Sequence, residues 1–251
     1  MKKSIGIIPA RYGSTRFPGK PLADILGKPM IQWTYENAKK SRSLDDIYVA
    51  TDDQRMMGVV GDFGGKAILT SPHHQSGTDR CMEVVEKLNY RPEIIINIQG
   101  DEPLIKPKMI DQLHAVINKN DHPLATLIQK INHQEILLDP NRVKVVVDKL
   151  GKALLFSRTA IPFVKNVKPD HWLANHHFYK HVGIYAYRYE ALNSITKLAV
   201  SSLEKMESLE QLRWLENGYP IYTGITQEVS PSVDTLEDLK AIVKLISEIK
   251  R

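Results

Sequence analysis

Short apolar runs alternate, in the first half of the chain, with longer segments whose apolar residues recur at helical spacing. The runs are rich in β-branched residues and predict strands, while the segments between them predict amphipathic helices. The predicted strands are Ile5–Ile8, Ile47–Thr51, Ala67–Thr70, Ile94–Ile98 and Thr126–Lys130, and the predicted helices are Met30–Ser41, Gln54–Phe63, Asp79–Leu88 and Pro107–Lys119. The alternation predicts an α/β fold with a mostly parallel central sheet flanked by helices.

The second half of the chain is less regular. Residues 143–147 and 153–156 predict a hairpin, and HVGIYAYRY (181–189) alternates as a strand. Residues 202–218 predict one helix ended by Gly218, with an apolar stripe that comprises Leu203, Met206, Leu209, Leu212 and Leu215. A last helix follows VDTLEDL, where Asp234 or Thr235 would be the N-cap. The polar stretch NVKPDHWLANHHFYK predicts an excursion from a single domain that spans residues 1–251.

Composition narrows the classes of protein that fit. The chain has 251 residues, 42% of them hydrophobic and 25% charged, with a formal charge of +5. No apolar run approaches the ~20 residues of a membrane span, and the N-terminal run is too short for a signal peptide. The lone Cys81 allows no intrachain disulfide, so a cytoplasmic protein without membrane insertion is expected. The mild basicity favours a small anionic ligand over nucleic acid, because long basic blocks and nucleic-acid-binding signatures are lacking.

The loops that follow four predicted strands carry most of the polar chemistry. In an open parallel sheet, ligands bind beyond the carboxyl ends of the strands, so these loops should share one edge. They read PARYGSTR, DD, SPHHQSGTDR and QGDEP. Their placement at one edge follows from topology and predicts a binding site there.

The loop IPARYGSTRFPGKPL places three cations among glycines and prolines. It lacks G-x-G-x-x-G, and five residues separate Gly13 from Gly19 while Pro21 follows Lys20, so it is no P-loop. Hydride-transfer enzymes and P-loop ATPases are therefore disfavoured. Glycine backbone amides and basic side chains still suit a phosphate group. The alternative interpretation is a solvated basic turn.

Carboxylates and histidines raise the question of a metal. Asp101 and Glu102 in QGDEP are hard oxygen ligands of the kind Mg²⁺ takes, although Gly-Asp is also common in turns. Asp234 is a second candidate carboxylate or an N-cap. A zinc site at His177 and His181 is improbable, because their i,i+4 spacing needs a helix and the segment alternates as a strand. Cys81 is interpreted as a packing residue.

Several segments, taken in order, resemble the 3-deoxy-manno-octulosonate (Kdo) cytidylyltransferases, also called CMP-Kdo synthetases. They are IPARYGSTRFPGKPL, SGTDR, NIQGDEPLI, NRVKVV, FSRTAIPF, HVGIYAYR, LEQLRWLENG and VDTLEDL, and the resemblance runs from Ile5 to about Leu239. It implies a Rossmann-like, GT-A-like nucleotidyltransferase fold. It also implies a cytoplasmic enzyme that uses Mg²⁺ to convert CTP and Kdo into CMP-Kdo and pyrophosphate for lipopolysaccharide. A homodimer formed through the excursion around residues 155–190 is expected.

The resemblance also implies a role for individual residues. The first loop would bind the nucleotide through Arg11, Gly13, Ser14, Arg16 and Lys20, and SGTDR would line the cytosine pocket through Ser76, Gly77, Thr78 and Arg80. Asp101 and Asp234 would hold the metal and act in catalysis with Lys20. The sugar site would comprise Gln99, Arg158, His181, Tyr185, Glu210 and Gln211. Arg158 suits bidentate pairing with the sugar carboxylate.

Two alternatives remain open. A related cytidylyltransferase would activate 8-amino-Kdo or a sialic acid, although sialic-acid enzymes usually lack the RFPGKPL ending. A regulatory nucleotide-binding module without catalysis is disfavoured, because a pure binder has no need of two metal carboxylates.

Overall fold

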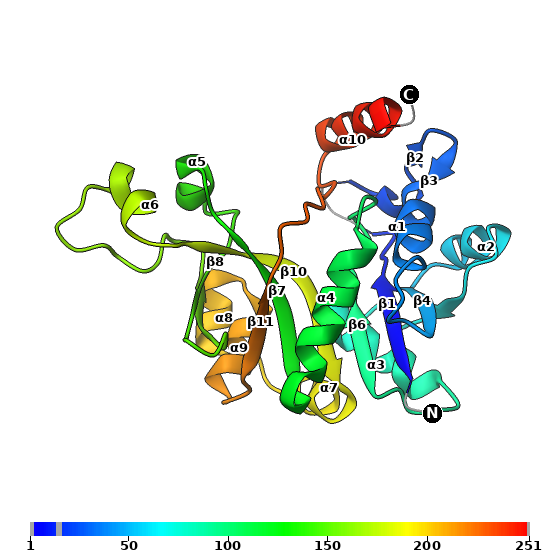
Figure 1. The fold of residues 1–251 in the computed structure, drawn as a ribbon. Coiled ribbons are helices and arrows are strands. Elements are labelled where there is room, and N and C mark those ends of the chain that lie inside the picture. The colour runs from blue at the N-terminus through cyan, green and yellow to red at the C-terminus, as the bar shows by residue number, and fades with distance from the viewer. Residues whose placement is uncertain (1–2, 14–16, 250–251) are drawn as a thin grey trace. The chain divides into compact units, whose positions relative to one another are not determined.

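The computed structural model describes residues 3–13 and 17–249. Ser14 and Arg16, both predicted to bind the nucleotide, lie outside the described residues. The chain divides into two compact units, one formed by Met1–Asp111 with Glu228–Arg251 and the other by Gln112–Gln227 (Figure 1). Each unit is described by itself. The helices of the described part are too short or too polar to cross a bilayer.

The first unit is built on parallel strands in the order β6, β1, β4, β5. These are β1 (Ser4–Pro9), β4 (Asp46–Thr51), β5 (Ala67–Leu69) and β6 (Ile94–Asn97). All four residues of β6 are buried, as the unbroken run IIIN predicts for a strand covered on both faces. The predicted α/β class with a mostly parallel sheet is confirmed.

Helices alternate with these strands, as the sequence pattern predicts. They are α1 (Met30–Ala38), α2 (Gln54–Asp62), α3 (Gly77–Lys87) and α10 (Leu236–Ile249), while α4 (Pro107–Asn118) leads from the first unit into the second. A short antiparallel pair, β2 (Asp24–Ile25) and β3 (Lys28–Pro29), precedes α1. Residues of α10 pack with Met30, Leu104 and Val233 in one apolar cluster, and this packing fixes the chain on either side of Asp234.

The second unit centres on β7 (Leu124–Lys130), which pairs with parallel β11 (Ile221–Ile225) and antiparallel β10 (Tyr179–Arg188). The predicted hairpin is confirmed as β8 (Lys144–Val147) and β9 (Ala153–Ser157). The pairing of β10 with β7 shifts register between Val182 and Tyr185, so β10 carries a bulge there.

Short helices complete this unit: α5 (Gln134–Leu138), α6 (Trp172–Asn175), α7 (Tyr189–Ile195), α8 (Ser202–Glu207) and α9 (Glu210–Glu216). The excursion contains α6 and has an apolar cluster in which Trp172 and Phe178 pack against Ile131 and Leu137.

The prediction of one helix over residues 202–218 is wrong. The chain breaks between α8 and α9 at Ser208, whose φ of 52° is left-handed. Met206 is 83% exposed and Leu203 42% exposed, so the apolar stripe does not form one buried face. The break is stabilised by contacts of Glu207 with residues 157 and 158, which a straight helix would not make.

Thr235, and not Asp234, caps α10. Its hydroxyl accepts a hydrogen bond from the Asp238 amide at 3.1 Å, and the Asp238 carboxylate accepts one from the Thr235 amide at 2.8 Å. This reciprocal pair is a capping box. The carboxylate of Asp234 is therefore not committed to the helix terminus.

We expect Gly100→Ala to destabilise the protein by about 1–3 kcal/mol, the range for overpacking a tight site. A Cβ at this position would lie 2.7 Å from the carbonyl oxygen of Pro9, and backbone cannot move as a flexible side chain does. Urea unfolding of the two proteins measures the difference. Gly58→Ala is the matched control, because it meets open space in α2 and should stabilise by about 0.5–1 kcal/mol. A Gly100→Ala protein as stable as the wild type would contradict the close approach.

Candidate active site

The loop after β1 is shaped at its end by Gly19. This residue has a φ of 72°, which glycine adopts without strain, and its amide donates to the Tyr12 carbonyl at 3.0 Å. A single 3₁₀ turn, Lys20–Leu22, follows with Pro21 buried in it. Proline fixes the backbone of that turn. The backbone of this turn therefore fixes the direction in which the Lys20 side chain leaves the chain.

Lys20 joins three segments that are far apart in the sequence. Its ammonium Nζ lies 2.7 Å from Asp101 Oδ2, 2.8 Å from the Val233 carbonyl oxygen and 3.5 Å from Asp234 Oδ1. The Val233 amide in turn donates to the Asp101 carbonyl at 2.9 Å. The side chain of Lys20 is only 13% exposed, so its ion pairs are partly shielded from water. The two predicted metal carboxylates therefore converge on one cation.

These groups line a cavity of about 370 Å³ beside the ends of β1 and β6. The cavity is lined in part by predicted site residues, namely Arg11, Gly13, Lys20, Gln99, Asp101 and Asp234. Space of this size and basic side chains on its wall suit a phosphate-bearing small molecule.

The cavity offers two carboxylates that could hold a divalent cation. Two carboxylate oxygens face the same point, where the Lys20 ammonium shows that a positive charge is accommodated. Clusters of three or more His, Cys, Asp or Glu side chains with ligand geometry are not found in residues 3–13 and 17–249. Mg²⁺ typically takes one or two carboxylates and completes its shell with water and substrate phosphates. The donor set therefore fits such an ion.

The SGTDR segment begins α3 beside the end of β1. Ser76 is the N-cap and forms a capping box with Asp79, so the helix starts two residues earlier than the periodicity predicts. A Cβ added to Gly77 would lie 3.4 Å from Pro9 Cγ, at the end of β1. The turn at Gly77 therefore lies next to the start of the loop after β1. Thr78, also predicted to line the cytosine pocket, is 2% exposed.

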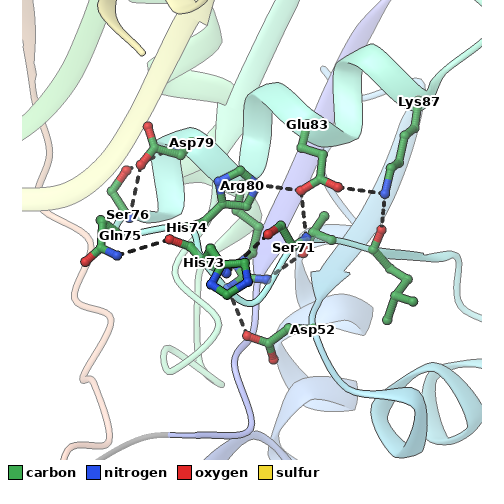
Figure 2. A network of polar contacts seen from close by, with 12 residues as sticks. Asp52, Ser71, His73, His74, Gln75, Ser76, Asp79, Arg80, Glu83 and Lys87 are labelled. Atoms are coloured by element: carbon green, nitrogen blue, oxygen red, sulfur yellow. Dashed lines mark hydrogen bonds and ion pairs between the residues drawn. The ribbon is translucent and has the colours of Figure 1, made fainter. Parts of the chain in front are cut away.

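Arg80, the last predicted member of the cytosine pocket, is 1% exposed and forms polar contacts below the surface (Figure 2). Its guanidinium donates to Asp52 Oδ2 at 3.0 Å and to the Thr70 hydroxyl at 2.5 Å. Asp52 and Thr70 come from the ends of two neighbouring strands. Arg80 thus ties α3 to the loops after β4 and β5, so we expect it to support the pocket from behind.

Glu83 holds the preceding loop against α3 (Figure 2). Its carboxylate accepts hydrogen bonds from the Ser71 amide at 2.8 Å and from the His74 ring, and it pairs with Lys87 at 2.7 Å. Burial acts to raise the pKa of Glu83, but these contacts outweigh it and lower the pKa to about 2. The loop that leads into SGTDR is therefore anchored by a carboxylate that stays ionised.

Four predicted sugar-site residues lie on β10 and α9 in the second unit. His181 Nε2 lies 3.0 Å from the Thr126 hydroxyl, whose oxygen is also 2.8 Å from the Ile184 carbonyl. The single hydroxyl proton is needed for that carbonyl, so His181 donates through Nε2 and Nδ1 remains an acceptor. Burial lowers the pKa of His181 to about 3, so the ring is neutral at neutral pH.

Tyr185 lies next to His181 on β10, with their ring centroids 5.1 Å apart. Its hydroxyl oxygen is buried and has no hydrogen-bond partner within the described part of the chain. Burial raises the pKa of Tyr185 well above 10.0, helped by the charge of Glu210. Tyr185 therefore stays protonated, and its hydroxyl can donate a hydrogen bond to a ligand. Glu210 and Gln211 occupy the first turn of α9, where Gln211 is 5% exposed.

Arg158 follows β9 and lies against the junction between α8 and α9. Its Nε donates to the Glu207 carbonyl at 2.6 Å, and its terminal nitrogens donate to the carbonyls of Pro140 and Ser208 at 3.1 and 3.4 Å. A guanidinium has five N–H donors, so two remain for a ligand beyond these contacts. The second unit thus brings Arg158, His181, Tyr185, Glu210 and Gln211 into one region, whereas Gln99 belongs to the first unit.

Several residues that support the predicted site residues within each unit carry no signal in the sequence. Thr126, Glu207 and the Val233 carbonyl act through hydrogen bonds to residues distant in the chain. Such contacts leave no periodicity or local motif. Asp52 lay in a loop assigned to the ligand edge, but its pairing with Arg80 was not predicted.

Comparisons with known proteins agree with this geometry. The sequence model of the cytidylyltransferase family matches residues 5–227. A 3-deoxy-manno-octulosonate cytidylyltransferase of Parabacteroides distasonis is 48% identical over 251 residues, which cover 98% of this chain and 99% of the relative. One from Cytophaga hutchinsonii is 51% identical over 236 residues, or 94% of each chain.

Solved structures give the same result. A CMP:2-keto-3-deoxy-manno-octonic acid synthetase complexed with CTP superposes with a TM-score of 0.91 at 44% identity, covering 98% of this chain and 99% of that one. A cytidylyltransferase from Leptospira borgpetersenii, at 16% identity and a TM-score of 0.64, shares the fold. The chain therefore belongs to the cytidylyltransferase family. Its resemblance to the 3-deoxy-manno-octulosonate cytidylyltransferases, inferred above from motifs, is confirmed.

We expect His181 to make the protein less stable as the pH falls from 6.5 to 5. Unfolded histidine binds a proton near pH 6.5 whereas folded His181 does so only near pH 3, so the unfolded state gains protons first. The loss amounts to about 2 kcal/mol over this window. It should be absent from the His181→Gln protein, whose free energy of unfolding depends less on pH. Urea unfolding at several pH values measures this.

The exposed His177 provides the matched control, as His177→Gln should keep the wild-type pH dependence. Equal pH slopes for His181→Gln and the wild type would show that His181 is not held neutral.

Proposed function

We propose that this protein transfers the cytidylyl group of CTP to Kdo, giving CMP-Kdo and pyrophosphate for lipopolysaccharide synthesis in the cytoplasm. The observation that carries the proposal is the convergence of Lys20, Asp101 and Asp234 in one cavity at the ends of β1 and β6. The relatives named 3-deoxy-manno-octulosonate cytidylyltransferase support the choice of nucleotide and sugar. A regulatory module without catalysis has no use for this pair of carboxylates.

The reaction joins two electron-rich partners, so positioning and charge decide its rate. The anomeric hydroxyl oxygen of Kdo attacks the α-phosphorus of CTP, and the bond to the pyrophosphate oxygen breaks. Asp101 and Asp234 would hold the divalent ion, Mg²⁺ in this proposal, which when bound polarises the phosphoryl group and lowers the pKa of the attacking hydroxyl. Lys20 and Arg11 line the same cavity and would neutralise the triphosphate as negative charge moves onto the leaving group.

The sugar site is suited to a polyhydroxylated acid. The neutral His181 would accept a hydrogen bond from a sugar hydroxyl at Nδ1, and the Tyr185 hydroxyl would donate one. Glu210 and Gln211 supply further acceptors and donors, while the remaining N–H groups of Arg158 would pair with the sugar carboxylate. Correct orientation of the hydroxyl and the α-phosphorus can contribute several kcal/mol to the rate enhancement.

Pyrophosphate release tests this function directly. We expect the wild-type protein to release it from CTP, Mg²⁺ and Kdo, and Asp101→Asn to lower kcat by about 10³-fold, because a metal-bound charge contributes several kcal/mol. The exposed Asp62 on α2 gives the matched control, Asp62→Asn, with wild-type turnover. The same assay with 8-amino-Kdo and sialic acid tests the alternative substrates. No release with any of these sugar acids would refute the proposed function.

We further propose that two copies of the chain pair through the excursion around residues 155–190. Apolar side chains are exposed there and on the adjoining strand β9, including Phe163 at 75% and Leu155 at 40%. Single large apolar residues on a monomer surface are common, but a group of them marks an interface. We expect light scattering to give twice the chain mass of 28.5 kDa, and Phe163→Glu to shift it toward one chain. A wild-type monomer would contradict the pairing.

A further inference from the structure

Glu207, at the end of α8, contacts two elements that carry predicted sugar-site residues. One carboxylate oxygen accepts from the Ser157 hydroxyl at 2.6 Å, and the other accepts from the Arg158 amide at 2.9 Å. Its own backbone carbonyl accepts from Arg158 Nε at 2.6 Å. A single residue thus binds both the backbone and the guanidinium of Arg158.

The same residue determines where α9 begins. Ser208 follows it in a left-handed conformation, and the Ser208 carbonyl accepts from an Arg158 terminal nitrogen at 3.4 Å. Glu210 and Gln211 come directly afterwards, in the first turn of α9. The contacts of Glu207 therefore set the direction of α9 relative to the end of β9, so Arg158 and the acidic end of α9 are positioned together.

A buried ammonium lies close to this junction. Lys144 is fully buried on β8, opposite Ser157 in the β8–β9 register, and its Nζ donates to the Asp139 carbonyl at 2.7 Å. Burial lowers the pKa of Lys144, and the neighbouring positive charge of Arg158 lowers it further, while the negative charges of Asp139 and Glu207 raise it. The Glu207 carboxylate contacts both Ser157 and the Arg158 amide. Its negative charge partly balances the positive charges of Lys144 and Arg158.

We propose that Glu207 is a positioning residue for sugar-acid recognition. Its carboxylate, held by Ser157 and the Arg158 amide, fixes the turn before α9 against the end of β9. That turn presents the Glu207 carbonyl that orients the Arg158 guanidinium toward the ligand carboxylate, and it places Glu210 and Gln211 for the hydroxyl groups. This inference rests on the proposed function, because the ligand it concerns is the sugar acid. Glu207 is predicted to touch no substrate atom.

The experiment compares steady-state kinetics of Glu207→Gln with the wild type, using CTP, Mg²⁺ and Kdo. A glutamine can keep both contacts, because the Ser157 hydroxyl can accept from its amide group, but the carboxylate charge that strengthens them is removed. We expect KM for Kdo to rise about tenfold, because neutral hydrogen bonds hold the start of α9 and the end of β9 less firmly than charge-assisted ones. KM for CTP should change less than about twofold, because the phosphate and base residues lie in the first unit.

Glu216→Gln is the matched control. Glu216 lies at the end of α9 and also accepts from a serine hydroxyl, that of Ser201, and from a backbone amide, that of Leu203 at 3.1 Å. It makes no contact with Arg158 among the contacts described. A merely structural role for Glu207 would lower the melting temperature of both variants alike and leave the two KM values in their wild-type ratio, which would overturn the inference.

Ser157→Ala provides a milder change if Glu207→Gln does not fold. It removes one donor to the carboxylate and should raise KM for Kdo in the same direction by a smaller factor, and an unchanged KM would count against the inference. A wild-type protein that releases no pyrophosphate refutes the proposed function, whereas wild-type turnover with unaltered KM for Kdo in Glu207→Gln refutes only the role of Glu207.

Discussion

The Lys20 ammonium is the interaction on which the geometry of the nucleotide site depends. Like charges repel, so a cation that pairs with both Asp101 and Asp234 favours their approach. The ammonium satisfies both carboxylates and the Val233 carbonyl at the same time. The apolar packing of α10 and the Val233–Asp101 backbone contact then keep the C-terminal segment in place. The proposed catalytic carboxylates are therefore held by the same contacts that fix the C-terminal segment of the fold.

The two units contribute different kinds of chemistry. The first provides fixed charges, with cations and carboxylates at the ends of parallel strands, as phosphoryl transfer requires. The second provides groups that burial keeps neutral: His181 stays deprotonated and Tyr185 stays protonated across the physiological range. Neutral donors and acceptors suit sugar hydroxyls, while in the proposed function Arg158 would supply the positive charge for an acid. This division matches a reaction between a triphosphate and a sugar acid.

The sequence predicts the fold of the first unit well because its signals are local. Ile5–Ile8 and Ile94–Ile98 are apolar runs of strand length, and both became buried parallel strands, here β1 and β6. The loops that follow them were expected at one edge, and Lys20 and Asp101 do meet there. The features that the sequence pattern does not predict depend on contacts between residues that are distant in the chain or on individual hydrogen bonds. The break at Ser208 falls within a favourable helical stripe, and the contacts of Glu207 and Ser208 with the end of β9 accompany it. The choice of Thr235 over Asp234 as the cap likewise required the hydrogen bonds themselves.

The most direct test of the central claim is a crystal structure with a non-hydrolysable CTP analogue and Mn²⁺, measured for anomalous scattering. We expect a single strong peak bound by the carboxylates of both Asp101 and Asp234, with the Lys20 ammonium against the phosphates. An anomalous peak that contacts neither carboxylate, or an Asp234 side chain turned away from Asp101, would contradict it.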